Sequence, residues 1–394
     1  MTIAEPTAPP CPEAISTPPP APAAPANGSP TAAGEGHWRR LLAPYKRASR
    51  RRALGQLANS ALPFAAIWAL AAWSFQVSYL WTLALAVPAA FFFTRLFIVQ
   101  HDCGHGSFFR SAKANNALGA VLGVVTLFPY GYWRRTHAIH HATSGNLDQR
   151  EFGDVDTLTV REYRALPRWR RLGYRLYRHP VVLFAVGPFY QFVLKHRFPL
   201  DLPWAWKREW KSVLWTNLGI AAAAGVLGAL VGWTTFLAVH LTIVLVAGAL
   251  GVWLFYVQHQ FEDTYWEDQE AWDFYRAGAH GSSFYDLPPI LHWLTGNIGY
   301  HHIHHLSSRI PNYRLRETFE ENPELQRVTR LTLRDSLACA RLRLWDEDGR
   351  RMIGWRELRA IGKSSGPDAS VLVERAVDRA GPGGPAQDSR VPQI

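Results

Sequence analysis

Four long apolar segments are the feature that most constrains how this chain can fold. They cover residues 53–75, 80–99, 213–232 and 233–257. Each is long enough for an α-helix that crosses the hydrocarbon core of a bilayer, which is about 30 Å thick. The short sequence QVSY joins the first two segments, and a tight turn at Gly232 and Trp233 joins the last two. The sequence therefore predicts an all-α integral membrane protein with four transmembrane helices in two hairpins.

Two further apolar segments are not expected to cross the membrane. Residues 116–133 contain glycine, proline and aromatic residues and are too short for a full crossing, so we expect them to dip into the membrane or lie on its surface. Residues 180–194 are interrupted by proline and glycine, and we expect this piece to be interfacial or buried.

The two ends of the chain differ in composition from its middle. Residues 1–36 are rich in proline and alanine and lack the basic and apolar regions of a signal peptide, so they are predicted to be a disordered tail. Residues 364–394 are predicted to be a second flexible tail, which leaves residues 37–363 as one membrane domain. The three cysteines, Cys11, Cys103 and Cys339, are widely separated, so a disulfide framework is not expected.

The distribution of charge predicts an orientation. The basic sequence WRRLLAPYKRASRRR at residues 38–52 directly precedes the first span. By the positive-inside rule this places the N-terminus in the cytoplasm, and four crossings return the C-terminus to the same side. The net charge of +11 could also suggest nucleic-acid binding. The basic residues lie beside spans and in loops, however, and no nucleic-acid-binding module is recognised, so no nucleic-acid partner is expected.

Histidine is concentrated in three motifs, HDCGH at 101–105, HAIHH at 137–141 and HHIHH at 301–305. On a helix, positions i, i+3 and i+4 share one face, so the histidines of each motif can converge. The eight histidines in this register are His101, His105, His137, His140, His141, His301, His304 and His305. Imidazole is the commonest metal ligand in proteins, and eight nitrogens exceed what one ion needs. The spacing therefore predicts a two-metal site in a helical cap on the cytoplasmic side.

A structural role is the alternative for every histidine. Side-chain packing gives no reason for paired histidines on one helix face, so this alternative is disfavoured for the three motifs. An isolated histidine such as His240, inside the fourth span, is expected to be a packing residue instead. The same expectation applies to His179, His196, His280 and His292, and Cys103 is expected to be a small packed side chain.

The position of the motifs separates two classes of function. In transporters, ionisable groups usually lie near the middle of the bilayer on broken helices. Here the motifs lie just beyond the inner ends of the spans, where a lipid chain and a soluble electron donor can both approach. This favours an enzyme that acts on lipid. A nonenzymatic membrane metal-binding or transport protein is the alternative from another class.

In their order, and with two hairpins among them, the three motifs resemble the histidine boxes of the integral-membrane fatty acid desaturases, over residues 95–315. Two flanking sequences, VWLFYVQHQFEDTYW at 252–266 and GNIGYHHIHHLSSRIPNYRL at 296–315, are similar to bacterial acyl-lipid desaturases that insert Δ12 or ω-6 double bonds. The resemblance implies an enzyme of the bacterial inner membrane. It would use dioxygen and two electrons to form a cis double bond in a monounsaturated acyl chain.

The resemblance also implies the cofactor and its ligands. Two iron ions would be held by the eight histidines of the boxes and by one more, His259, after the fourth span. His302 lies outside the register of the third box. Some members carry an asparagine four residues before the extra histidine, where this chain has Phe255, and Asn297 is the candidate that would compensate for it.

Partners and alternative reactions follow from the same resemblance. No heme-binding domain is recognised in the chain, so a separate electron donor such as ferredoxin is expected, attracted by the basic cytoplasmic face. The substrate would be an acyl lipid or acyl thioester. A fatty acid hydroxylase, an acetylenase or a carotenoid oxygenase would be the alternatives on the same scaffold. Six carboxylates near the boxes could orient the ligands: Asp102, Asp148, Asp154, Asp156, Glu262 and Asp263.

Overall fold

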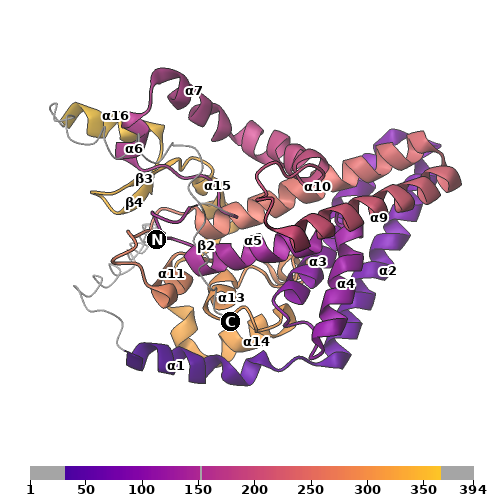
Figure 1. The fold of residues 1–394 in the computed structure, drawn as a ribbon, viewed down its shortest axis with the longest axis horizontal. Helices are drawn as coiled ribbons and strands as arrows, with labels where there is room; N and C mark the ends of the chain where they lie inside the picture. The colour runs from indigo at the N-terminus through magenta and orange to yellow at the C-terminus, as the bar shows by residue number, and fades with distance from the viewer. Residues whose placement is uncertain (1–31, 151–152, 365–394) are drawn as a thin grey trace, which may run out of the picture.

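The computed structural model describes residues 32–150 and 153–364. The described part is mostly helical, and four of its helices are long and apolar enough to cross a membrane. They are α2 (Arg50–Phe75), α3 (Tyr79–Gly104), α9 (Lys207–Val231) and α10 (Trp233–His259). These helices form the two predicted hairpins, whose closed ends lie together at one extremity of the molecule (Figure 1). The predicted fold class is therefore confirmed.

The local sequence explains the two hairpin turns. Before α3, the Ser78 side chain accepts a hydrogen bond from the Leu80 amide at 3.2 Å and caps the helix. Between α9 and α10 stands Gly232, with φ +87° and ψ 140°. Residues that carry a Cβ rarely adopt this backbone conformation, whereas glycine adopts it readily. A single residue therefore joins the last two spans.

Small side chains line the contact among α2, α3 and α10. Ala71 of α2 and Ala86 and Ala89 of α3 are completely buried, and they pack in one cluster with Val239 and Ile243 of α10. Small residues let helix backbones approach closely, which is how helices pack in a membrane, where van der Waals contact replaces the exclusion of water. The first hairpin and the last span thus form one unit.

A charged residue within α3 is satisfied inside the protein. Arg95 is only 3% exposed. Its Nε donates to the Ser60 hydroxyl at 3.1 Å and its Nη2 to the Asn59 side-chain oxygen at 2.8 Å, while Nη1 donates to the Trp293 carbonyl. Charges inside a span are tolerated where polar groups meet them. Arg95 therefore links both helices of the first hairpin to the residues that cover it.

The other helices surround the ends of the spans that lie opposite the two hairpin turns. Helix α4 has 14 residues and is about 21 Å long, which is too short to cross the hydrocarbon core. Residues 182–195 form one π-helical segment, then a short α-helix that packs on α10, and then a second π-helical segment. The bounds of these helices are α1 (Ala32–Leu42), η1 (Ala43–Lys46), α4 (Ala112–Val125), α5 (Tyr130–Thr143), α6 (Val160–Ala165), α7 (Arg168–Tyr177), η2 (Val182–Val186), α8 (Gly187–Phe189), η3 (Tyr190–Lys195), α11 (Phe274–His280), α12 (Pro289–Leu294), α13 (His301–Leu306), α14 (Asn312–Glu321), η4 (Pro323–Gln326), α15 (Leu333–Cys339) and α16 (Trp355–Ser364).

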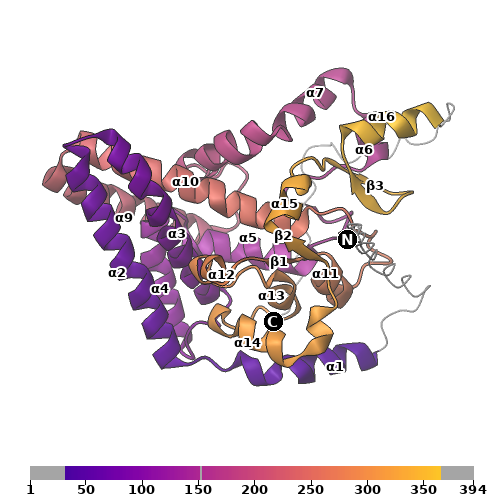
Figure 2. The same ribbon diagram turned by 180° about the vertical axis from the view of Figure 1, so that it is seen from behind.

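The structure also contains two small sheets, and the sequence did not indicate these strands. β1 (Phe284–Asp286) pairs in parallel with β2 (Arg330–Thr332), and β3 (Leu344–Asp346) pairs antiparallel with β4 (Arg351–Ile353). Seen from behind, α11 to α14 gather beside the ends of the spans that lie opposite the hairpin turns, and α1 runs along one edge (Figure 2). We refer to residues 260–353 as the cap. Most of the two predicted tails, residues 1–31 and 365–394, lies outside the described part. The remaining residues of the first predicted tail, 32–36, are helical, because α1 begins at Ala32.

Candidate metal centre

Four separate segments bring histidine side chains to one place. His101 lies in the last turn of α3 and His105 directly follows that helix. Helix α5 carries the second motif and α13 the third, and His259 ends α10. In each motif the i, i+3 or i+4 spacing turns the side chains to a common face, as the sequence predicts. The nine predicted ligands therefore meet although they span most of the membrane domain.

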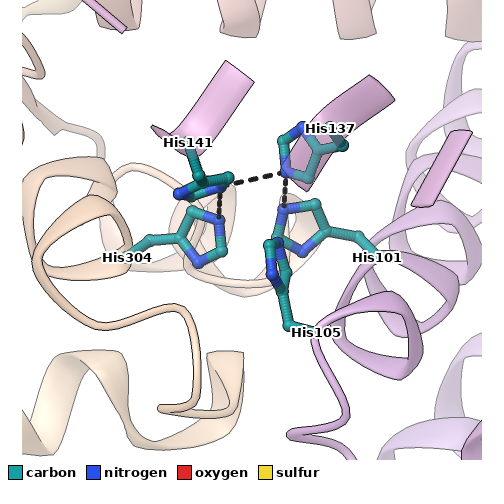
Figure 3. A group of neighbouring side chains, drawn as sticks. All are labelled: His101, His105, His137, His141 and His304. Atoms are coloured by element: carbon teal, nitrogen blue, oxygen red, sulfur yellow. Dashed lines mark hydrogen bonds between the residues drawn. The ribbon is translucent and has the colours of Figure 1, made fainter. Parts of the chain in front are cut away.

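The nine histidines divide into two groups, in each of which the nearest ring nitrogens all lie within 4.8 Å of one another. The five-histidine group comprises His101, His105, His137, His141 and His304. Figure 3 shows these five rings turned toward a common centre. The four-histidine group comprises His140, His259, His301 and His305. Because the second and third motifs each contribute to both groups, the two groups lie side by side.

The spacing of the nitrogens suits metal coordination. In the five-histidine group, Nε2 of His137 lies 3.0 Å from Nε2 of His101 and 3.1 Å from Nε2 of His141, which lies 2.9 Å from Nε2 of His304. Two nitrogens that each lie about 2.1 Å from one ion, at a right angle, are about 3.0 Å apart. In the four-histidine group, Nε2 of His259 lies 2.9 Å from Nε2 of His301. Both groups therefore have the geometry of ligand sets.

Several buried ring nitrogens have no hydrogen-bond partner within the described residues. These include Nε2 of His105, His140 and His305. Buried polar atoms are nearly always partnered in proteins, so such a concentration needs an explanation. A metal ion in each group would accept the lone pairs of these nitrogens. The donor set and its unpartnered atoms thus fit two metal ions.

The protonation state agrees with a ligand role. Burial, followed by the charge of neighbouring imidazoles, holds the pKa of His137, His141 and His304 well below the usual range. The same causes lower the pKa of His301 and His305. A neutral imidazole carries the lone pair that a metal needs. These side chains are therefore available as ligands at neutral pH.

Three rings of the two groups, those of His101, His140 and His259, have a partner at Nδ1. Asp154 accepts from His140 at 2.7 Å, Asp102 faces His101 at 3.2 Å, and the Gly281 carbonyl accepts from His259 at 3.1 Å. Such contacts fix the tautomer and the orientation of a ligating histidine. Two of the six carboxylates proposed from sequence thus fill the expected role. The sequence missed the Gly281 carbonyl, because a backbone group leaves no signal in residue identity.

A chain of buried hydrogen bonds fixes the Asp102 carboxylate in turn. Its Oδ2 accepts from the Asn312 amide at 2.7 Å and from the Asn312 side-chain nitrogen at 2.8 Å. The Asn312 side-chain oxygen accepts from Gln56 at 2.7 Å. Because Gln56 lies in α2, Asp102 in α3 and Asn312 in α14, this chain fixes the third motif against the first hairpin. Two other carboxylates have different partners: Asp148 accepts from the Gln269 amide, and Glu262 accepts from the Arg351 side chain.

The remaining histidines lie outside both groups, as expected. His302, on the far side of α13, is fully buried with Nε2 3.0 Å from the Leu325 carbonyl. His292 accepts from the Leu287 amide at 3.2 Å and stacks on Tyr300. His240 stacks on Phe236 with ring centroids 5.4 Å apart.

One side of the four-histidine group is apolar. The Phe255 ring centroid lies 5.2 Å from that of His140 and 5.0 Å from that of His259. The side-chain nitrogen of Asn297 donates to the Asn312 carbonyl at 3.4 Å. Asn297, which the sequence analysis suggested as a substitute ligand, thus contacts α14 through its side-chain nitrogen.

Comparison with known proteins gives consistent matches. The family model described as Fatty acid desaturase matches residues 78–335. A protein named Fatty acid desaturase from Bacillus subtilis is 48% identical over 328 residues, which cover 83% of this chain and 93% of that protein. An sn-1 acyl-lipid omega-3 desaturase (ferredoxin) of Synechocystis sp. is 32% identical over 238 residues, covering 58% of this chain and 63% of that one. An sn-1 oleoyl-lipid 12-desaturase of Anabaena variabilis is 26% identical over 262 residues, covering 62% and 72%.

Proposed function

Since the chain belongs to the fatty acid desaturase family, we propose that it introduces a cis double bond into an acyl chain of a membrane lipid, with dioxygen as the oxidant. Dioxygen takes up four electrons, two from the acyl chain and two from an external donor. Two hydrogens leave adjacent carbons of the chain, two protons are taken up from the medium, and two water molecules form. The products therefore balance only if a donor supplies two electrons in each turnover.

The observation that carries this proposal is the pair of adjacent histidine groups. We propose that they hold two iron ions, with His101, His105, His137, His141 and His304 at one and His140, His259, His301 and His305 at the other. Bound there, iron would supply the redox chemistry that removes hydrogen from an unactivated methylene. The carboxylates of Asp154 and Asp102 hold their histidine partners in the ligating tautomer. The burial of the ligands keeps bulk water away from the reacting chain.

The proposals for the electron donor and for the orientation of the chain in the membrane rest on the charge of the chain and on the names of relatives. Two cyanobacterial relatives are named as ferredoxin-dependent acyl-lipid desaturases. We propose an acidic donor of the ferredoxin type that approaches the cap from the cytoplasm. The basic residues 38–52 directly before the first span support this orientation in a bacterial inner membrane. Residues 37–363 would then form one membrane domain.

The position of the new double bond is proposed to be Δ12, on the methyl side of an existing double bond. The sequences around His259 and the third motif support this position. One relative is named an sn-1 oleoyl-lipid 12-desaturase and another an sn-1 acyl-lipid omega-3 desaturase. The substrate would be an oleoyl lipid and the product a diene.

The test is the fatty-acid profile of a bacterial host that is rich in oleate and supplied with a ferredoxin system. The host would express the intact chain, the His141→Ala variant or the His179→Ala variant, since His179 is an exposed histidine outside both groups. We expect a new diene with the intact chain and with His179→Ala, and none with His141→Ala. Gas chromatography of derivatised products would locate the bond. A hydroxylated product would contradict the reaction type, and bound iron with an unchanged profile would contradict the substrate.

A further inference from the structure

A basic pocket opens beside the histidine groups. It is a cavity of about 420 Å³. Three segments form it: the residues before α2, the residues after α3, and the loop between α13 and α14. Its lining residues, which define the basic pocket from here on, are Lys46, Arg47, Ala48, Gly106, Ser107, Phe109, Arg110 and Arg309. Four of the eight are cationic and none is acidic.

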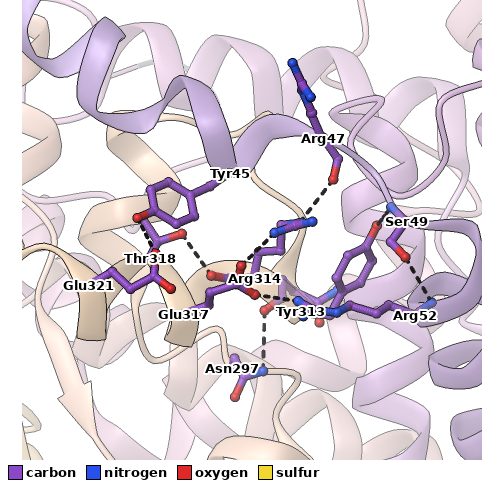
Figure 4. Close-up of polar contacts among 11 residues, drawn as sticks. Tyr45, Arg47, Ser49, Arg52, Asn297, Tyr313, Arg314, Glu317, Thr318 and Glu321 are labelled. Atoms are coloured by element: carbon purple, nitrogen blue, oxygen red, sulfur yellow. Dashed lines mark hydrogen bonds and ion pairs between the residues drawn. The ribbon is translucent and has the colours of Figure 1, made fainter.

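The cations of the basic pocket have no acidic counter-ion in the described part of the chain. Among the described residues, no carboxylate pairs with any of the four lining cations. The neighbouring carboxylate of Glu317 is already engaged, at 2.5 Å from Arg52 and 2.7 Å from Arg314 (Figure 4). Burial, and then the charge of Arg309, lower the pKa of Lys46, as expected where cations are crowded without a counter-ion. The pocket is therefore suited to an anion from outside the protein.

The walls of the basic pocket are held in place by α14. Arg314 donates to the Arg47 carbonyl at 3.1 Å, and the Tyr313 hydroxyl accepts from the Ser49 amide at 2.9 Å. Figure 4 shows the Arg47 side chain directed away from α14 while its backbone is held. The Lys46 and Arg309 side chains make no hydrogen bond or ion pair within the described residues. Two of the cationic groups thus remain available on a fixed frame.

The level of the pocket in the molecule indicates the source of the anion. Lys46 to Ala48 lie just before Ser49, which caps α2, and Gly106 to Arg110 lie just after His105, which follows α3, so the pocket lies at the ends of two spans. The phosphates of a bilayer lie at this level, just outside the hydrocarbon core. Gly106 also follows the ligand His105, and a Cβ added at Gly106 would lie 3.2 Å from Nη1 of Arg309. Arg309 is therefore a direct neighbour of the five-histidine side of the site.

We propose that the basic pocket binds the phosphate of a membrane phospholipid and thereby presents the acyl chains of that lipid to the histidine groups. The inference deepens the proposed desaturase function and rests on it. Arginine and lysine recognise phosphate through charge-assisted hydrogen bonds. Phe109 and Ala48 add an apolar wall for the carbons next to the phosphate. A lipid without a phosphate would leave the four cations uncompensated.

The test measures lipid binding without turnover. The full chain in detergent is titrated with dioleoyl phosphatidylglycerol and, separately, with dioleoylglycerol, which has the same acyl chains and no phosphate. Native mass spectrometry reports the bound fraction. The pocket variant is Lys46→Gln with Arg309→Gln, because neither side chain has a hydrogen-bond or ion-pair partner among residues 32–150 and 153–364. The control is Arg356→Gln with Arg359→Gln, two exposed cations of α16 far from the pocket.

We expect the pocket variant to bind the phosphatidylglycerol at least about tenfold more weakly than the intact chain, because two charged donors are lost. The control variant should bind it like the intact chain, and dioleoylglycerol should bind both alike. Equal phosphatidylglycerol affinity in the pocket variant and the intact chain would overturn the proposal. So would full displacement of this lipid by equimolar inorganic phosphate, since the pocket would then serve a soluble anion. Because no turnover is measured, these outcomes are independent of whether the chain desaturates.

Discussion

At the residue scale, the contact between Asp154 and His140 depends on the glycine that precedes the aspartate. Gly153 has φ +83°, and a Cβ added there would lie 2.8 Å from the Cβ of His140. Glycine thus permits the loop to approach α5 closely enough for the 2.7 Å contact between the carboxylate and the ring. The carboxylate accepts the proton on Nδ1, which leaves the lone pair of Nε2 free for a metal.

Asp154→Asn should weaken metal binding about 10–100-fold, the usual cost of losing such a partner of a ligating histidine. The amide keeps the size of the side chain and removes its negative charge. Iron retained per chain, measured by mass spectrometry after dialysis against a series of chelator concentrations, checks this expectation. Asp263→Asn is the matched control, because Asp263 is exposed and is not a partner of any ligand histidine. Equal retention by the two variants would show that Asp154 does not support the ligand.

At the scale of elements, the hairpin between α9 and α10 depends on Gly232. Replacing it with valine forces a branched side chain into φ +87°, which should lower the free energy of unfolding by about 1–3 kcal/mol. Gly225→Ala is the contrasting variant, because Gly225 lies inside α9 with open space around it, and alanine there favours the helix. Thermal unfolding in detergent should therefore shift in opposite directions for the two. A Gly232→Val midpoint at or above that of the intact chain would contradict this account.

Elements also differ in how well the sequence predicts them. The spans and the ligand faces of α5 and α13 were predictable, because hydropathy and i, i+4 spacing are local properties. The place of His259 in the four-histidine group required the resemblance to a family, since a lone histidine has no spacing to interpret. Strands of three residues, such as β1, are too short for an alternating pattern to appear. Asn312, which donates both hydrogen bonds to Oδ2 of Asp102, lies 210 positions away in the chain, so only the folded chain reveals this contact.

At the scale of the whole molecule, buried histidines link stability to pH. Burial lowers the pKa of His302 to about 4, from an ordinary value of 6.5. Between these two values the folded chain keeps His302 neutral while the unfolded chain takes up a proton. Stability from this residue is therefore complete above pH 6.5 and falls as the pH decreases. The loss from His302 alone should reach about 2 kcal/mol at pH 5.

The measurement is the thermal unfolding midpoint of the metal-free protein at pH 7 and pH 5, for the intact chain and for His302→Gln. Glutamine can still donate to the Leu325 carbonyl but does not titrate. We expect the intact chain to lose more stability than the variant between the two pH values, by about 2 kcal/mol. If both chains respond equally to pH, His302 does not contribute to the dependence.

The distribution of the nine histidines over four segments sets an order of events during biosynthesis. The first of them, His101, ends the second span, and the last, His305, lies 46 residues beyond the end of the fourth. Neither group can be completed until α13 has left the ribosome, and by then both hairpins have been translated. If the two groups hold iron as proposed, membrane insertion therefore precedes loading of the metal. A cell deprived of that metal should accumulate inserted chains that can be activated later, without new protein synthesis.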